Sequence, residues 1–314
     1  MELRLLQYAL EVYRKRSFTK AAVSLHIAQP SLSQQIRKLE EEIGVCLFYR
    51  GHGPVVLTPE GIRFIEKAEQ IIRAHDDLLR EMHESNEGVG SELTIGVPAV
   101  TGGHVLPPLI QAYLERYPQV KVHLIEESTE ELEHLTVRGI VDLSVLPLPI
   151  ESNRLVTRSM LTETLLLAIP REEKNWMSEE VRFIVNSVDE NVQVAEKMLP
   201  LAAVNESPFI LLKQGFGFRR VVLDLCAESG FQPQVAFMTS NIETAQSLVA
   251  SGLGVTIVPK MVMRQNLKLN PLYVPLDSHP TRTLVFTYLG ERYLSLTART
   301  FMDVFDEVFG DLGI

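Results

Sequence analysis

Residues 29–43, QPSLSQQIRKLEEEI, combine side chains that could read DNA. Four apolar residues recur at spacings of four, three and four, which predicts a helix with one buried stripe. The stripe consists of Leu32, Ile36, Leu39 and Ile43. At about 100° per residue, the opposite face carries Pro30, Ser33, Gln34 and Arg37. Gln can hydrogen-bond adenine through two atoms, Arg can bind guanine or a phosphate, and Ser tolerates several bases.

The following segment, CLFYRGHGPVVLTPEG (46–61), adds basic groups suited to the DNA backbone. Its Gly-Pro-rich loop precedes a short predicted strand at 55–57, and Arg50 and His52 at the loop tip are placed to meet phosphates. The acidic run Glu40–Glu42 would be repelled by phosphates, so the N-terminal end of the helix is expected to enter the groove. The predicted DNA-binding residues are Thr19, Gln29, Pro30, Ser31, Ser33, Gln34, Arg37, Lys38, Arg50 and His52. A solvated face on a small helical bundle would show a similar pattern, and the pattern alone leaves that alternative open.

Four predicted strands farther along the chain end in loops that could offer hydrogen-bond donors to a small molecule. Strands at 93–97, 120–125, 141–146 and 209–212 lead to loops in which the chain turns back or a helix can begin. Unpaired N–H groups at helix N-termini favour negative charge, although each loop also fits ordinary capping. The predicted effector-binding residues are Pro98, Thr101, Gly102, Ser128, Thr129, Pro147, Gln214, Gly215 and Phe216.

Motifs for catalysis and for metal binding are absent from the sequence. There is no HExxH, G-x-S-x-G, P-loop or G-x-G-x-x-G segment, and the eight histidines have no ligand-like spacing. The two cysteines, Cys46 and Cys226, are far apart, which fits a reducing compartment and argues against a disulfide framework. Cys226, in the helical run VVLDLCAE, is predicted to be a small core residue. No catalytic residue, metal site or cofactor is predicted.

The elements around the DNA-reading face form a helix-turn-helix pattern. A first helical run at 19–25 carries the pair Ala21 and Ala22, and a tight turn at 26–29 precedes Pro30 at the start of the second helix. Gly44 is placed to end that helix. The loop and strand of 50–57 then resemble a wing, and Thr58-Pro59 predicts the cap and first residue of another helix.

Length and charge indicate a multidomain protein with an uneven charge distribution. The 314 residues exceed one ordinary core, and the formal net charge is −10. The first 59 residues nevertheless hold more Lys and Arg than Glu, so the remainder is strongly acidic. No uncharged apolar run is long enough for a transmembrane helix, and the N-terminus predicts an amphipathic helix rather than a signal peptide. The expected location is the cytoplasm.

The stretch SFTKAAVSLHIAQPSLSQQIRKLEEEIGVCLFYR, continued by LTPEG, resembles the winged helix-turn-helix of LysR-type transcriptional regulators. The AA pair, QPSLSQQI, LE-x-x-x-G-x-x-LF-x-R and LTPEG occur in family order, and SGLGVTIVP (251–259) is similar to the family as well. One departure is Ala28, where many members have a serine as helix cap. The resemblance implies an effector-responsive, sequence-specific DNA-binding regulator that works as a dimer or tetramer. Residues 1–59 are then the DNA-binding domain.

A long helix is predicted to follow and to mediate self-association. Apolar residues from Ile65 to Met82 recur in a heptad-like seam, and Phe64, Ile71 and Leu78 form a second stripe beside it. One stripe can pack on the DNA-binding domain, and the other needs a second copy of the chain. His75 lies in the seam and is interpreted as a boundary residue rather than a sensor. Residues 60–91 are assigned as this linker helix and a hinge.

The acidic remainder, residues 92–314, alternates short apolar runs with helical patterns, which predicts α/β architecture with a mostly parallel sheet. Two stretches, 153–169 and 272–289, lack helices and could cross between lobes. The resemblance implies a two-lobed effector domain similar to periplasmic solute-binding proteins, with one lobe at about 92–162 and 267–314 and the other at about 163–266. On that model the predicted effector residues converge on one cleft and favour an anionic or carboxylate ligand.

Residues 174–206 form a longer segment than the family usually has at this place. Ser187 and Glu190 fit a capping box, which predicts an additional helix at about 188–199. A decoration of the lobe and a lid over the effector are both compatible with it. Two other function classes, an enzyme and a solute-binding receptor without DNA function, lack support from the motifs and from the N-terminal pattern respectively.

Overall fold

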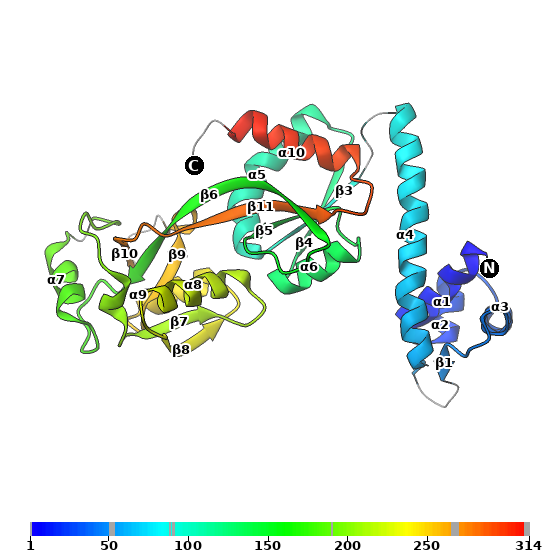
Figure 1. Ribbon diagram of the computed structural model, residues 1–314, viewed down its shortest axis with the longest axis horizontal. Coiled ribbons are helices and arrows are strands. Elements are labelled where there is room, and N and C mark those ends of the chain that lie inside the picture. Colours follow the sequence, from blue (N-terminus) through cyan, green and yellow to red (C-terminus); the bar gives the residue numbers. More distant parts are fainter. Residues whose placement is uncertain are drawn as a thin grey trace. The chain divides into compact units, whose positions relative to one another are not determined.

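The chain divides into two units, Met1–Gly88 and Val89–Ile314. The computed structural model describes residues 2–49, 54–87, 89, 92–189, 191–264 and 270–310. Figure 1 shows a largely helical N-terminal unit and an α/β C-terminal unit. This confirms the predicted fold class, a helical N-terminal part ahead of an α/β remainder.

The N-terminal unit contains four helices and a two-stranded hairpin in its described residues. They are α1 (Leu3–Lys15), α2 (Phe18–Ser24), α3 (Gln29–Ile43), β1 (Phe48–Tyr49), β2 (Val56–Leu57) and α4 (Pro59–Glu87). The predicted stripe of α3 lies in the shared core, where Leu32, Ile36 and Leu39 are buried and Ile43 packs against them. Ala21 and Ala22 of α2 are buried in the same core, so the small side chains let the two helices approach closely.

The ends of α3 and the start of α4 follow the sequence signals. Gly44 ends α3 in the left-handed conformation with φ 75°, which glycine adopts without steric cost. Ala28 offers no side-chain cap at the other end. Thr58 accepts a hydrogen bond from the Gly61 amide at 2.9 Å, as an N-cap does.

Glu40, the first residue of the acidic run, has a structural role inside the N-terminal unit. Its side chain is buried and accepts a hydrogen bond from the Leu47 amide at 2.7 Å. A carboxylate that accepts backbone N–H groups is stabilised where it would otherwise lose water. Glu40 therefore fixes the chain that leads from α3 into β1.

In α4, burial of the apolar residues depends on their position along the helix. The predicted division into one stripe on the core and one stripe facing a partner is not what the structure shows. Ile65 and Ala68 are buried in the core of the N-terminal unit, and Phe64 and Ile72 pack against that core. From Ile71 onward, four large apolar side chains of α4 are exposed. Their exposed fractions are 43% for Ile71, 55% for Leu78, 47% for Leu79 and 51% for Met82. We call these four residues the open face of α4.

The C-terminal unit is built on a seven-stranded sheet in the order β10-β6-β11-β5-β3-β4, with β9 beside β6. These strands are β3 (Glu92–Val97), β4 (Lys121–Glu126), β5 (Leu143–Pro147), β6 (Leu155–Ile169), β9 (Thr256–Pro259), β10 (Leu272–Pro275) and β11 (Thr281–Leu289). Strands β7 (Pro208–Leu212) and β8 (Gln234–Thr239) form a separate parallel pair. The helices are α5 (Ala99–Arg116), α6 (Thr129–Val137), α7 (Glu179–Ser187), α8 (Gly217–Glu228), α9 (Ile242–Ala250) and α10 (Leu296–Phe309), with 3₁₀ turns η1 (Leu201–Val204) and η2 (Lys260–Val262).

The prediction of a mostly parallel sheet is wrong for the seven-stranded sheet. Strand β3 is parallel to β4 and β5, but β11 is antiparallel to β5 and β6, and β6 is antiparallel to β9 and β10. Parallel neighbours need a crossover that returns the chain to the same end, usually through a helix. Strands β6, β10 and β11 lie in the stretches without helices, so they run against their neighbours.

Each of the two lobes has its own hydrophobic core. One contains β3, β5, α5 and α10, and the other contains β7, β9, α7, α8 and α9. The long strand β6 belongs to both regions, because its first part pairs with β11 and its last residues pair with β9 and β10. Figure 1 shows β6 and β11 extending between the two groups of helices, as predicted for the helix-free stretches. The exact lobe boundaries remain a prediction.

The predicted additional helix at 188–199 is wrong. The helix of this segment is α7, which begins after Ser178, whose hydroxyl accepts from the Val181 amide at 3.4 Å. The residues from 191 to 199 instead follow β10: the Ala195 amide donates to the Tyr273 carbonyl at 2.8 Å, and Leu199 forms a bridge to Leu276. Backbone pairing with a neighbouring strand competes successfully with a marginal helical pattern. Glu190 of the expected capping box lies outside the described residues.

Candidate DNA-binding face and effector pocket

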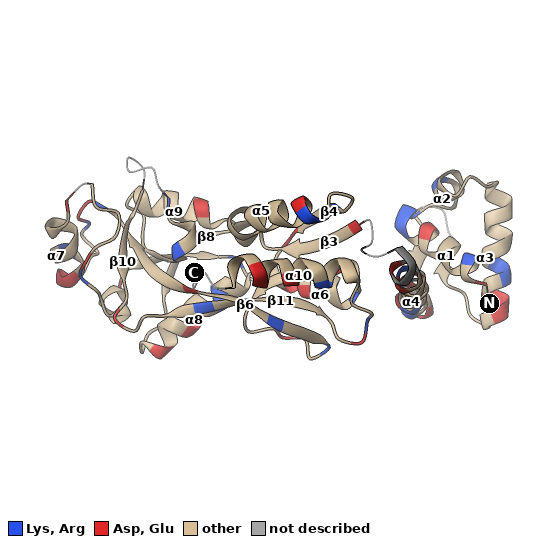
Figure 2. Ribbon diagram, turned by 90° about the horizontal axis from the view of Figure 1, so that it is seen from above, with Lys and Arg blue, Asp and Glu red and all other residues tan. Residues whose placement is uncertain are grey.

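Helix α3 presents the predicted reading face to solvent. Gln34, Arg37 and Lys38 are exposed, and Ser33 is half-buried. They lie on the side away from the buried stripe, as the helical spacing requires. Basic residues on α3 appear as blue segments in Figure 2. The other described members of the predicted set are also exposed, namely Thr19, Gln29, Pro30 and Ser31.

The first turn of α3 carries one internal hydrogen bond that shapes this face. The Gln29 side-chain amide donates to the Ser33 hydroxyl at 2.9 Å. The structure shows no protein partner for the Gln34 amide among the described residues, so its donor and acceptor are available to a base edge. Arg50 and His52, predicted for the wing tip, lie outside the described residues.

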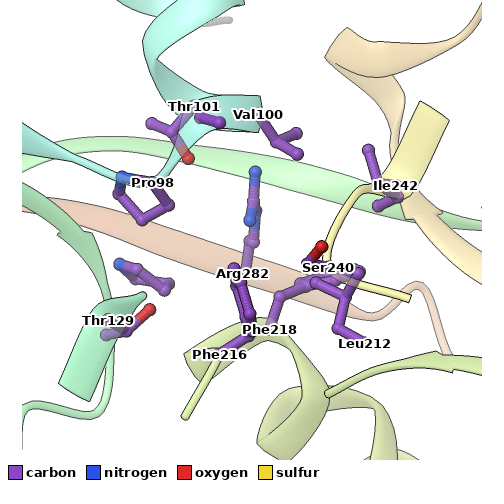
Figure 3. A pocket seen from close by; sticks show the side chains of 12 residues that line it. Pro98, Val100, Thr101, Thr129, Leu212, Phe216, Phe218, Ser240, Ile242 and Arg282 are labelled. Atoms are coloured by element: carbon purple, nitrogen blue, oxygen red, sulfur yellow. The ribbon is translucent and has the colours of Figure 1, made fainter. Parts of the chain in front are cut away.

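A pocket lies in the C-terminal unit where α5, α6, α8 and α9 begin. The cavity itself is small, about 30 Å³, within about 420 Å³ of non-atom space that includes open solvent. Figure 3 shows several of its side chains turned toward a common centre. The lining residues are Pro98, Ala99, Val100, Thr101, Thr129, Pro147, Leu212, Phe216, Phe218, Ser240, Ile242 and Arg282.

The structure brings together five of the nine predicted effector residues in this pocket. They are Pro98, Thr101, Thr129, Pro147 and Phe216. The hydroxyl oxygen of Thr101 points into the space, as Figure 3 shows. These five residues come from β3–α5, from α6, from the end of β5 and from the β7–α8 loop, so strand ends in two lobes do converge.

The remaining four predicted residues have other positions. Gly102 packs on Val97, whose side chain lies 2.9 Å from the position of an added Cβ. Ser128 caps α6 by accepting from the Glu131 amide at 3.3 Å. Gln214 is exposed, and Gly215 lines a neighbouring cleft instead. None of these four lines the pocket described above.

Hydrogen bonds join the starts of α6 and α8 across the lobes. The Gly217 amide donates to the Thr129 hydroxyl at 3.0 Å, and the Glu130 amide donates to the Gly215 carbonyl at 3.1 Å. The prediction treated the α8 start as a source of free N–H groups. At Gly217 the N–H group is already paired, because the hydroxyl of the opposing lobe accepts its hydrogen.

The start of α5 is different, because no side chain caps it. Its N-cap residue is Pro98, and the first intrahelical hydrogen bond runs from the Gly102 amide to the Pro98 carbonyl at 2.9 Å. The preceding amides have no carbonyl in the helix to donate to. Two of the residues that carry them, Val100 and Thr101, line the pocket, so an acceptor in the pocket can meet these donors.

Arg282 is the main residue of the pocket that sequence reasoning missed. It lies on β11, and its side chain extends toward Val100 and Thr101 in Figure 3. Its Nε donates to Glu163 Oε1 at 2.6 Å, and both side chains are only 3% exposed. The guanidinium also lies over the ring of Phe218, 4.9 Å from its centroid.

Burial is the largest cause of the pKa shifts of Arg282 and Glu163. Loss of water raises the pKa of the Glu163 carboxyl and lowers the pKa of the Arg282 guanidinium, and each partner's charge opposes the change. Arg282 Nη2 and Glu163 Oε2 are buried without a hydrogen bond of acceptable geometry, although Nη2 lies 2.6 Å from Glu163 Oε1. The pair therefore has unused hydrogen-bonding capacity beside the pocket.

The described part of the chain contains no group of three or more His, Cys, Asp or Glu side chains that could hold a metal ion. Within the same residues, no helix has the length and apolar character needed to cross a membrane.

Two family models match nearly the whole chain. Residues 3–62 match the model described as bacterial regulatory helix-turn-helix protein, lysR family. Residues 86–310 match the LysR substrate binding domain.

Individual proteins and structures agree with these matches. The HTH-type transcriptional regulator YcgK of Bacillus subtilis is 55% identical over 304 residues, covering 97% of this chain and 94% of that protein. The dual regulator OxyR of Escherichia coli is 29% identical over 290 residues, covering 92% and 89%. The full-length regulator CbnR in complex with its target DNA has a similar fold, with a TM-score of 0.67 at 21% identity, covering 98% of this chain and 99% of that one. Full-length OxyR from Pseudomonas aeruginosa has a TM-score of 0.72 at 23% identity, covering 98% and 95%.

Proposed function

Because the chain belongs to the LysR family of transcriptional regulators, it is an effector-responsive DNA-binding regulator, and we propose that Ser33, Gln34 and Arg37 read its operator. The observation that carries this assignment is the exposed polar face of α3 opposite its buried stripe. The first half of this helix enters the major groove. Lys38 and the wing residues Arg50 and His52 bind phosphates, which position the protein without reading sequence.

Replacing Gln34 with alanine should weaken binding to the cognate operator by about 1–3 kcal/mol and relax the base preference at one position. The lost contact is the pair of hydrogen bonds between the side-chain amide and a base edge. Gel-shift titrations against the operator and a set of single-base variants measure both effects.

Gln7→Ala is the matched control for this change. Gln7 is an exposed residue of α1, so the same chemical truncation occurs on the same unit away from α3. Operator affinity should stay within about twofold, because surface substitutions usually change free energies by under about 0.5 kcal/mol. If Gln34→Ala behaved like Gln7→Ala, α3 would not be the reading helix.

Self-association is a family property, and we assign it here to the open face of α4, where a second copy of the chain packs. Four large apolar side chains exposed along one side of a helix lose contact with water when a partner helix covers them.

The protein acts on its operator in the cytoplasm, and it has no catalytic role in this proposal.

The effector is a small anion held in the pocket by Thr101, Thr129 and the uncapped start of α5. Unpaired helix amides favour negative charge, and the Thr101 hydroxyl adds a donor aimed into the space. The acidity of the chain as a whole opposes an anion, but salt screens charges beyond about 10 Å. Local donors therefore outweigh the distant carboxylates.

Changing Thr101 to valine should weaken the best effector from a metabolite screen by about 0.5–1.5 kcal/mol, the net value of one hydrogen bond. Thr101 is 1% exposed, and valine replaces the hydroxyl at nearly constant volume. Calorimetric titration of the full chain measures the change, with Thr157→Val, an exposed threonine of β6, as the matched control. Equal affinity in wild type and Thr101→Val, or a cationic best ligand, would reject this site.

Thiol-based peroxide sensing is not part of the proposal, although several relatives are named hydrogen peroxide-inducible genes activators. Cys226 is fully buried, and burial raises the pKa of its thiol to about 12. The thiolate is the reactive form, so this thiol stays inert near neutral pH. Cys46 is exposed but lies in the other unit.

An aromatic disulfide reagent should therefore react quickly with one thiol per native chain, and with both thiols only after denaturation. Cys46→Ser should remove the fast reaction entirely. Rapid labelling of Cys226 in the native Cys46→Ser variant would contradict the inert assignment and reopen a redox role.

A further inference from the structure

Arg16 holds a backbone conformation that is unfavourable for a residue with a side chain. It caps the C-terminal end of α1 with φ 48° and ψ 29°, in the left-handed region where a Cβ crowds the backbone. Among the described residues that are not glycine, only His26 and His279 also have a positive φ. Glycine is the usual residue at such a helix end, so an arginine there carries a conformational cost.

Hydrogen bonds fix this conformation on both sides of the residue. The Arg16 amide donates to the Tyr13 carbonyl at 3.3 Å, which closes the end of α1. The Arg16 carbonyl accepts from the Val55 amide at 3.0 Å, which joins the turn to the residue before β2 in the wing. Glycine could form both hydrogen bonds without the cost of a side chain. The turn therefore does not need an arginine in order to fold.

The guanidinium of Arg16 has no partner in the described part of the chain. The side chain is exposed, and it forms no hydrogen bond, ion pair or cation–π contact with any described residue. Contacts of that kind are how a guanidinium stabilises a folded protein. No such contact offsets the unfavourable conformation, which indicates that the side chain is kept for a partner outside the chain.

The charge around Arg16 identifies that partner as an anion. Residues 12–39 contain six lysines and arginines and no aspartate or glutamate, in a chain with a net charge of −10. Arg14 and Lys20, which are close to Arg16 in the sequence, are also exposed. Concentrated positive charge on a unit that binds DNA is the electrostatic mark of contacts with backbone phosphates.

Arg16 also lies where a helix-turn-helix protein meets the DNA backbone. The first helix of that motif crosses the backbone, while the second enters the major groove. Here the first helix is α2, which begins two residues after Arg16, and the hydrogen bond from Val55 places the wing on the other side of the turn. A side chain at this turn is suited to a phosphate rather than to a base edge.

We propose that Arg16 is a positioning residue that binds a backbone phosphate of DNA beside the wing. Its unfavourable conformation then serves binding and not folding. This inference rests on DNA binding by the N-terminal unit, and it does not depend on which residues of α3 read bases.

Arg16→Gly should separate binding from folding, because glycine favours the same turn and lacks the cation. The probe is a labelled DNA duplex of arbitrary sequence, since contacts with phosphates do not depend on sequence. Its affinity for the full chain should fall about five- to tenfold at about 0.1 M salt, and the slope of log K against log salt should become shallower by about 0.9. In hydrogen exchange followed by mass spectrometry, the amides of α1 and α2 should exchange no faster than in wild type.

Two further variants serve as controls. Arg16→Lys keeps both the charge and the conformational cost, so it should retain the salt slope of wild type. Arg63→Gln removes a cation from the same unit, but Arg63 is already paired with Glu60 at 3.3 Å. It should therefore leave the slope unchanged.

A salt slope of Arg16→Gly equal to that of wild type would overturn the proposal. A fall in affinity together with faster exchange in α1 and α2 would also overturn it, because the arginine would then be needed for the fold. These outcomes are distinct from failure of the reading-face assignment, in which Gln34→Ala changes neither operator affinity nor base preference.

Discussion

Replacing Arg282 with leucine should lower the free energy of unfolding of the C-terminal unit by about 3–5 kcal/mol at neutral pH, because the change leaves Glu163 as an uncompensated buried charge. Both side chains of the pair are 3% exposed, so water cannot substitute for the lost guanidinium. Leucine also gives up the contact of the guanidinium with the Phe218 ring. Urea unfolding of the full chain measures the effect through Trp176, the one tryptophan, which packs on a C-terminal core.

The decrease in the free energy of unfolding caused by Arg282→Leu should depend on pH. In the folded protein, burial raises the pKa of Glu163 above its unfolded value, and Arg282 opposes that rise. A group with a raised folded pKa contributes stability that is complete below the unfolded pKa and is lost as pH rises through the folded pKa. Removing Arg282 raises that pKa further, so the deficit of Arg282→Leu should be smallest in mild acid and grow toward higher pH.

A second substitution tests whether the buried charge is the cause. Arg282→Leu combined with Glu163→Leu removes both charges and should recover most of the lost free energy, since apolar pairs often replace buried ion pairs with little cost. Arg154→Leu is the control, because Arg154 pairs with Glu291 at 3.3 Å on the surface, where such pairs contribute about 1 kcal/mol or less. A single Arg282→Leu change as mild as Arg154→Leu would mean that water or relaxation satisfies Glu163.

The fold of the N-terminal unit could be predicted because its signals lie within single helices or at their ends. The stripe from Leu32 to Leu39 has helical periodicity, and Gly44 and Thr58 are strong local signals for a helix end and a helix cap. Each depends on residues within a few positions of each other. The proposed reading face is the side of α3 opposite this stripe, as helical spacing requires.

Arg282 could not be found in this way. It is the one charged residue of its strand, and its partner Glu163 lies 119 residues earlier in the chain. Only the antiparallel pairing of β6 with β11, in register at these two residues, makes them neighbours. That pairing belongs to the part of the sheet whose direction was predicted wrongly. Similarly, Glu40 gave no sign in the sequence that it would fold back to the Leu47 amide.

The apolar pattern of α4 could be predicted from the sequence, but the point along the helix where burial ends could not. Helical periodicity places Ile65, Ile72 and Leu79 in one seam, whereas the structure buries only the first part against the core of the N-terminal unit. How far that core extends along α4 depends on the packing of α1, which no local pattern in α4 encodes. The division matters for experiment, because a charge at Ile72 would disturb the core itself. Leu79 is the better position for testing self-association.

Leu79→Glu should reduce affinity for an operator with two half-sites by about a hundredfold or more, while affinity for a single half-site changes less than about twofold. Two linked reading heads bind the second half-site as an intramolecular step, and that gain is typically 10²–10⁴. A glutamate on the open face places two like charges against each other in a paired helix and removes apolar contact, so the pair separates. Each head retains its own core and α3.

Gln70→Glu is the control for added charge. Gln70 is exposed on α4, away from the open face by helical spacing, and its side-chain oxygen accepts from Lys67 Nζ at 3.1 Å, a contact that glutamate can keep. Gel-shift titrations on both DNA targets, beside analytical ultracentrifugation of the free protein, separate the two variants. Equal losses of Leu79→Glu on both targets would mean that the open face packs within one chain. A two-half-site defect confined to Leu79→Glu places the second copy on this face, because the control carries the same charge on the same helix.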